Sequence, residues 1–154
     1  MNSFEINQAL ASGEVDVQGV LPKVDALQNQ VAVFDLNFGL TELPREAGIL
    51  MIRGARQYGK STWLQQQIYT TVKEFGAGSA FYLNGDEIRN EHDLEEQLLT
   101  LSRLFSTQSR VRRIFVDEIT AISSWEKALK RLIDRDDLPG VLLITTGSKA
   151  TDLR

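Results

Sequence analysis

The segment Gly54–Ser61 reads GARQYGKS and matches the phosphate-binding pattern G-x-x-x-x-G-K-[ST]. Before it stands the apolar run 49–52 (ILMI), which is typical of a buried strand. After it, residues 60–75 carry apolar side chains at the spacing of an amphipathic helix. Because strand, glycine-containing loop and helix follow in the order that the motif requires, the match predicts a nucleoside-triphosphate site rather than a chance turn.

Three further apolar segments lack the alternation of apolar and polar residues that marks a half-exposed strand. Such continuous apolar runs are typical of strands buried on both faces. We predict strands at 49–52, 80–83, 113–117 and 141–144. Helical patterns separate these segments, so the chain is predicted to form a mainly parallel sheet covered on both faces, a three-layer αβα sandwich of the P-loop type. We divide the chain into an N-terminal extension, 1–47, and a P-loop core, 48–154.

The extension contains one predicted short helix, around Phe4 to Leu10, and one predicted short strand, 31–35. In the core, the helix after the second strand is predicted to start at Asn90, a good N-cap residue. Its apolar face is predicted to hold Leu94, Leu98, Leu101 and Phe105, and its exposed face Glu91, Glu95 and Glu96. The third core helix is predicted to open with a capping box of Ser123 and Glu126.

Composition limits the classes of function. The chain has 154 residues, enough for one domain, with a net charge of -4 and a pI near 5.1. This acidity gives no support to nucleic acid as a partner, although the basic cluster Arg110, Arg112 and Arg113 is either a solvated face or a local contact. Cysteine is absent, which excludes disulfides and thiolate metal sites. We find neither a signal peptide nor an apolar run of roughly 20 residues, so we expect a cytoplasmic protein without a membrane partner.

The loop and the start of its helix supply the groups that hold phosphates. Glycines let backbone N–H groups turn inward, Lys60 reaches the β- and γ-phosphates, and the Ser61 hydroxyl binds Mg²⁺. Arg56 either contacts phosphate or faces solvent. The candidate nucleotide-binding residues are Gly54, Ala55, Arg56, Gln57, Tyr58, Gly59, Lys60, Ser61 and Thr62.

The other candidate site residues follow the predicted strands. Asp117 ends the third strand and suits the Walker B carboxylate at Mg²⁺, and Glu118 next to it suits the activation of water. Alternatively, both are solvated residues at a strand end. Asn84 either restrains the Glu118 carboxylate or forms a turn before Gly85. Thr146 is a candidate for a contact to the γ-phosphate or the attacking water, with an ordinary strand-end threonine as the alternative.

Five blocks together resemble the archaeal and bacterial AAA+ ATPases that carry a C-terminal domain of unknown function. The blocks are GARQYGKS at 54–61, YLN at 82–84, FVDEI at 115–119, Trp125 and ITTGS at 144–148. The resemblance covers about residues 48–150. It departs from the usual pattern at Ala55, Tyr58 and Ser61.

The resemblance implies a fourth strand inserted between the first and the third, with ATP and Mg²⁺ as cofactors. It also implies that Asn84 restrains Glu118 and that Thr146 occupies the sensor position. A complete AAA+ module has a fifth strand, a helical lid and an arginine that acts in a neighbour's site. Because the chain ends at Arg154, we interpret it as an N-terminal fragment. We expect it to hydrolyse ATP weakly by itself, and to self-associate through AAA+ contacts or an unpaired edge of the P-loop strand.

The function predicted from these residues is an ATPase core that binds Mg-ATP and hydrolyses it with water activated by Glu118. The alternative is a nucleotide-dependent switch or scaffold that binds ATP with little hydrolysis. A small-molecule kinase would need an acceptor site and a lid with arginines, which the sequence does not show.

Overall fold

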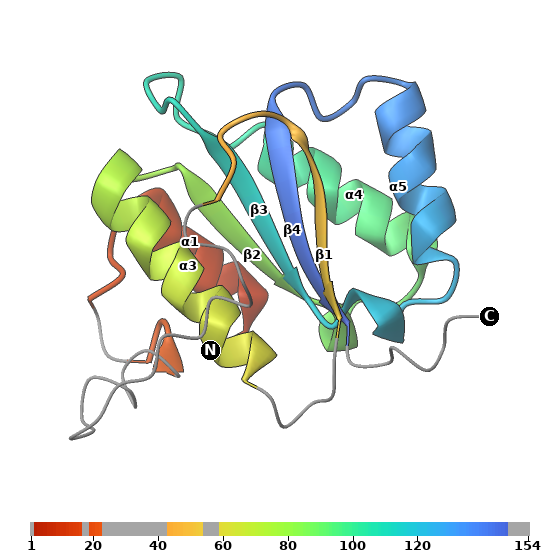
Figure 1. Ribbon diagram of the computed structural model, residues 1–154, viewed down its shortest axis with the longest axis horizontal. Coiled ribbons are helices and arrows are strands. Elements are labelled where there is room, and N and C mark those ends of the chain that lie inside the picture. Colours follow the sequence, from red (N-terminus) through yellow and green to blue (C-terminus); the bar gives the residue numbers. More distant parts are fainter. Residues whose placement is uncertain (1, 17–18, 23–42, 54–58, 148–154) are drawn as a thin grey trace.

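The computed structural model describes residues 2–16, 19–22, 43–53 and 59–147 (Figure 1). The strand predicted at 31–35 lies outside the described residues. The elements are α1 (Ser3–Ala11), β1 (Gly48–Arg53), α3 (Lys60–Phe75), β2 (Ala80–Asn84), α4 (Glu91–Ser102), β3 (Arg112–Asp117), α5 (Trp125–Asp134) and β4 (Val141–Gly147), with short 3-10 turns η2 (Gly85–Glu87) and η3 (Ile119–Ala121).

The four described strands form one parallel sheet in the order β1-β4-β3-β2. Helix α3 covers one face of this sheet, and α4 and α5 cover the other (Figure 1). All four predicted core strands are confirmed, and β4 lies between β1 and β3, as the family resemblance implied. The α/β sandwich is therefore the fold of the core, and the carboxyl ends of its strands share one edge.

The core forms where the central strands meet the helices on both faces. Side chains of β2, β3 and β4 are almost all buried, because each face of the parallel sheet packs under helices. Trp63 of α3 is fully buried and is part of this hydrophobic core. Of the helices in the described part of the chain, none combines the length and the apolar character that crossing a bilayer requires.

Arg113 corrects the prediction of an exposed basic cluster. Its side chain is buried, and its guanidinium donates to the Thr71 hydroxyl at 2.8 Å and to the carbonyl oxygen of Pro44 at 3.3 Å. The same guanidinium lies 5.2 Å from the centre of the Phe75 ring. Arg113 therefore joins β3 to α3 and to the segment before β1, because a buried cation needs hydrogen-bond acceptors around it.

Two predictions about helix α4 had different outcomes. The helix begins after Asn90, whose side chain accepts a hydrogen bond from the Asp93 N–H at 2.9 Å, as predicted. The prediction that Glu95 is exposed was wrong, because only 8% of the residue is accessible. Its carboxylate accepts hydrogen bonds from Arg131 and Arg135 of α5. Paired guanidiniums thus allow a carboxylate to lie between two packed helices.

The predicted capping box at the start of α5 was also wrong. The helix begins at Trp125, and its N-cap is Ser124, which has φ 60° and makes no side-chain capping bond. A Ser123–Glu126 capping box requires Ser123 to be the N-cap in an extended conformation. The N-cap is instead Ser124, one residue later, in a left-handed conformation. In the same helix, Ala128, Leu129 and Leu132 are buried, whereas Ile133 is 52% exposed.

Helix α1 protects the outer edge of β2. The Asn7 side-chain amide donates to the Tyr82 carbonyl oxygen at 2.7 Å and accepts from the Tyr82 N–H at 2.6 Å. Farther along the strand, the Asn84 N–H donates to the Ser3 hydroxyl at 3.1 Å. These side chains take the place of a neighbouring strand, which satisfies backbone groups that an edge would otherwise expose.

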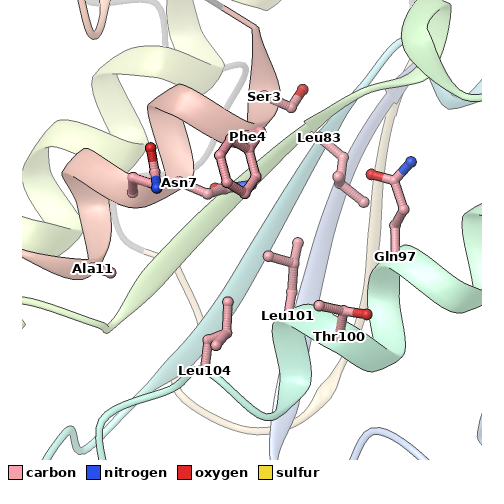
Figure 2. A pocket seen from close by; sticks show the side chains of 10 residues that line it. Ser3, Phe4, Asn7, Ala11, Leu83, Gln97, Thr100, Leu101 and Leu104 are labelled. Carbon is pink, nitrogen blue, oxygen red and sulfur yellow. The ribbon is translucent and has the colours of Figure 1, made fainter.

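An apolar groove of about 380 Å³ lies between α1 and α4 (Figure 2). Figure 2 shows Phe4 of α1, Leu83 of β2 and Leu101 of α4 on its walls. Phe4 and Leu104 are largely exposed at the same place. None of the predicted site residues that the structure describes lines this groove, so the groove is separate from the described part of the predicted nucleotide site.

Replacing Asn7 with alanine should destabilise the fold. The change leaves both backbone groups of Tyr82 buried without their partner, at a cost of about 2–4 kcal/mol for the two bonds. Urea unfolding should show this loss in Asn7→Ala, whereas Gln8→Ala, at an exposed position on the same helix, should stay close to the parent. Equal midpoints for the two variants would contradict the edge-pairing role of Asn7.

Replacing Glu95 with glutamine should weaken the contact between α4 and α5. Hydrogen bonds from Arg131 lower the pKa of Glu95 below its usual 4.5; burial opposes this shift, and a hydrogen bond from Arg135 adds to it. This contribution to stability is therefore complete above about pH 4.5 and is lost as the pH falls through the folded-state pKa. Near neutral pH, Glu95→Gln should lower the free energy of unfolding by roughly 2 kcal/mol relative to the parent. This difference between variant and parent should shrink as the pH falls. Chemical unfolding from pH 3 to 7 tests this, with the exposed neighbour Glu96→Gln as the matched control.

Candidate functional site

The carboxyl ends of three strands bring predicted site residues to one edge of the sheet. Asn84 ends β2, Asp117 ends β3 and Thr146 lies near the end of β4. Asn84 and Asp117 are partners in the register of the two strands. Ligands of open parallel sheets bind at this edge, so the topology places these polar residues where a nucleotide is expected.

A polar cavity of about 210 Å³ lies at the same edge, lined by Lys60, Ser61, Asp86 and Glu118. Lys60 is 3% exposed, and it is the first residue of α3. Its N-cap, Gly59, has φ 75°, a left-handed conformation that favours glycine. The N-terminal N–H groups of a long helix beside a lysine suit an anion such as phosphate.

The predicted residues of the phosphate loop divide into two groups. Gly59, Lys60, Ser61 and Thr62 are described and form the start of α3. The other predicted residues, Gly54, Ala55, Arg56, Gln57 and Tyr58, lie outside the described residues. The sequence analysis did not include Asp86 among the candidate residues. Its position directly after Asn84 and Gly85, where β2 ends, is the signal that could have identified it.

Thr146 joins the two acidic residues at the end of β3. Its hydroxyl donates to Asp117 Oδ1 at 2.7 Å and accepts from the Glu118 N–H at 2.9 Å. The residue is fully buried. A donor and an acceptor bond from one hydroxyl hold the Asp117 carboxylate and the Glu118 backbone in a single arrangement.

Tyr82 of β2 provides a second contact to Asp117. Burial raises the pKa of the Tyr82 phenol, and the charge of Asp117 and a hydrogen bond to its carboxylate raise it further, as does the charge of Glu87. The phenol therefore remains a protonated donor near neutral pH. The Thr146 hydroxyl of β4 thus orients the Asp117 carboxylate, and the Tyr82 phenol of β2 lies near it.

Glu118 has a left-handed backbone, with φ 57° and ψ 50°. Such a conformation is uncommon for a residue with a side chain and persists where its surroundings hold it. Gly85 is part of those surroundings. A Cβ at Gly85 would overlap the Glu118 carbonyl oxygen and would lie 2.8 Å from its carbonyl carbon. The end of β2 therefore approaches the turn at Glu118 more closely than any side chain permits.

The carboxylate of Glu118 and the amide of Asn84 have different hydrogen-bond partners. Glu118 Oε1 accepts from the Thr120 hydroxyl at 3.0 Å. Asn84 Oδ1 accepts from the Asp86 N–H at 3.0 Å, the contact of a turn-forming asparagine. The restraint of Glu118 by Asn84 stays a prediction.

The donor set at this edge fits a hard divalent cation. Mg²⁺ prefers oxygen ligands and is usually held by one or two protein groups together with nucleotide phosphates. The Ser61 hydroxyl and the Asp117 carboxylate are oxygen ligands of this kind, and both residues are partly accessible. The residues present therefore fit the predicted Mg²⁺.

Substituting Gly85 with alanine should disturb the turn at Glu118. The added methyl must push the Glu118 carbonyl away, so we expect lower stability, by about 1–3 kcal/mol, from this overpacking. Gly140→Ala is the matched control, because its Cβ would meet no neighbouring atom and would carry only the strain of φ 74°. Thermal unfolding compares the two, and a nucleotide-binding titration should show a larger loss for Gly85→Ala. A Gly85→Ala protein that matches Gly140→Ala in both assays would contradict the close-packing argument.

Comparison with known proteins agrees with the geometry. A family model described as "AAA domain" matches residues 46–154, which includes β1 through β4 and every predicted site residue. No curated protein matches the chain. Members of this family are generally nucleotide-binding ATPases. With a matched segment that spans most of its length, the chain belongs to the AAA domain family of P-loop ATPases.

Proposed function

We propose that the protein binds Mg-ATP at the start of α3 and hydrolyses it with water activated by Glu118. The observation that carries this proposal is the shared cavity of Lys60, Ser61 and Glu118. It joins a phosphate-binding cation and a hydroxyl, both at the start of α3, to a carboxylate from the turn between β3 and η3. Such convergence of different chemistries in one cavity favours a reaction site over three unrelated surface residues.

Each residue has a distinct role in this proposal. The Lys60 ammonium and the N–H groups at the start of α3 bind the phosphates. Ser61 and Asp117 hold Mg²⁺, which neutralises charge on the phosphate oxygens when it is bound. The Glu118 carboxylate accepts a proton from the water that attacks the terminal phosphate.

Thr146 supports the site by orientation. The sequence suggested a contact of this residue with phosphate or water. Its bonds to Asp117 and to the Glu118 N–H favour a role in holding the two acidic residues in place. Orientation of this kind contributes to catalysis because reacting groups lose little freedom when the substrate arrives.

The alternative is a nucleotide-dependent switch or scaffold that binds ATP with little hydrolysis. This alternative requires that Glu118, although it lines the cavity, does not activate water. Contacts between copies of the chain would suit either function. Strand β1 is at the end of the described sheet, and Ile49 on it is 40% exposed. Self-association through this edge remains our proposal.

Two substitutions test the proposed ATPase. Lys60→Ala should weaken ATP binding roughly 10- to 100-fold, because a buried charged hydrogen-bond donor to phosphate is lost. Glu118→Gln should leave ATP binding near the parent value and lower the single-turnover hydrolysis rate by about 10²–10⁴-fold. Fluorescent-nucleotide titration and single-turnover assays of the intact protein measure the two effects, with exposed Glu126→Gln as the control.

Two other outcomes separate the competing hypotheses. Hydrolysis by Glu118→Gln at the parent rate would exclude Glu118 as the group that activates water. A parent protein that binds ATP tightly but gives no single-turnover hydrolysis would favour the switch or scaffold.

A further inference from the structure

We propose that Thr120 is a positioning residue that aims the Glu118 carboxylate at the nucleotide cavity. This inference rests on the proposed function of Glu118. The observation behind it is the 3.0 Å hydrogen bond from the Thr120 hydroxyl to Glu118 Oε1. Glu118 also lines the same cavity as Lys60 and Ser61, and we infer that the bond keeps its carboxylate at that cavity.

The backbone turn at Glu118 makes this contact possible. Its left-handed conformation ends the strand direction of β3 and starts the 3-10 turn η3, in which the Ala121 N–H donates to the Glu118 carbonyl oxygen at 3.1 Å. The chain therefore folds back within two residues, and the Thr120 side chain returns to the Glu118 side chain. In a continuing strand, side chains two positions apart would be separated by roughly 7 Å along the strand axis.

Thr120 is itself held against the end of β4. A Cβ at Gly147 would lie 2.6 Å from the Thr120 Cγ2 and 3.2 Å from its Oγ1, so the threonine packs directly onto the glycine backbone. A β-branched side chain has few rotamers, and contact on its methyl restricts them further. The Thr120 side chain is therefore fixed at two points: its methyl packs on Gly147, and its hydroxyl bonds the Glu118 carboxylate.

This arrangement gives both acidic residues a partner linked to β4. Thr146 holds the Asp117 carboxylate and the Glu118 N–H, and Thr120, packed on Gly147, holds the Glu118 carboxylate. The water-activating group is therefore positioned at its backbone and at its side chain. Hydrogen bonds to an ionised acceptor are the stronger ones, which suits a positioning contact.

The test separates the hydroxyl of Thr120 from its methyl in the intact protein. Thr120→Val keeps the shape on Gly147 and deletes the donor, whereas Thr120→Ser keeps the donor. Thr120→Val should lower the single-turnover hydrolysis rate at saturating Mg-ATP about tenfold, the loss expected for one charged hydrogen bond. ATP affinity and thermal unfolding should stay near the parent values. Thr120→Ser should retain a rate within about threefold of the parent, since the donor remains.

A double variant shows whether Thr120 acts through Glu118. In the Glu118→Gln background, adding Thr120→Val should leave the residual hydrolysis rate unchanged, because the positioned carboxylate is already absent. If Thr120→Val does not fold, Thr120→Ala and Thr120→Ser form the comparison, and only the alanine variant should lose the rate.

The outcomes distinguish this inference from the proposed function. If Glu118→Gln is inactive while Thr120→Val equals or exceeds the parent, Thr120 is not a positioning residue, although the proposed function stands. An equal rate loss in Thr120→Val and Thr120→Ser would also overturn the role of the hydroxyl. A parent without single-turnover hydrolysis, or a Glu118→Gln protein as fast as the parent, would overturn the proposed function and the role of Thr120 with it.

Discussion

The pairing of β4 between β1 and β3 determines where the site residues lie. Register along β4 pairs Gly147 with Arg53, the last residue of β1, on one side. On the other side it pairs Thr145 with Val116, the residue before Asp117. The Thr146 hydroxyl uses that position to bond Asp117 and the Glu118 N–H. If another strand lay between β4 and β3, Thr146 and Asp117 would stand on strands about 9.6 Å apart, twice the spacing of neighbouring strands and too far for a direct hydrogen bond.

Close backbone packing then sets the direction of Glu118. The residue leaves β3 through a left-handed turn between two glycines, Gly85 at the end of β2 and Gly147 at the end of β4. Gly85 admits the Glu118 carbonyl, and Gly147 admits the Thr120 side chain. Both positions lie at the rim of the sheet, where small residues allow neighbouring chain segments to come together. The shape of the site therefore depends on the absence of side chains at Gly85 and Gly147 as well as on the polar residues.

The two ends of the described sheet differ in how their edges are covered. Asn7 of α1 bonds both backbone groups of Tyr82, which closes the outer edge of β2. The same strand carries the Tyr82 phenol toward Asp117, so the N-terminal helix supports the strand that contacts the site. The buried side chains of α1 belong to the same core as the sheet, which links the N-terminal segment energetically to the core. The boundary at residues 47 and 48 stays a prediction.

The sequence by itself determined the order of the described elements and the four core strands, because these depend on local apolar periodicity. Its short motif predicted a phosphate-binding segment between β1 and α3. Helices α3 and α4 could also be predicted closely, since Gly76 and Asn90 mark an end and a start within the chain. Only the tertiary structure decided which charged groups are buried. The sequence predicted Glu95 and Arg113 to be exposed, because the partners that allow them to be buried, on α5 and on α3, are distant in sequence.

The contacts around Glu118 were likewise outside the reach of sequence patterns. No sequence pattern indicated the hydrogen bond from the Thr120 hydroxyl to the Glu118 carboxylate, whereas the restraint of that carboxylate by Asn84 stays a prediction. The reason is the left-handed backbone of Glu118, a conformation that its own side chain does not favour. Packing on Gly85 and Gly147, from strands far along the chain, holds that turn and so decides which neighbour the carboxylate meets.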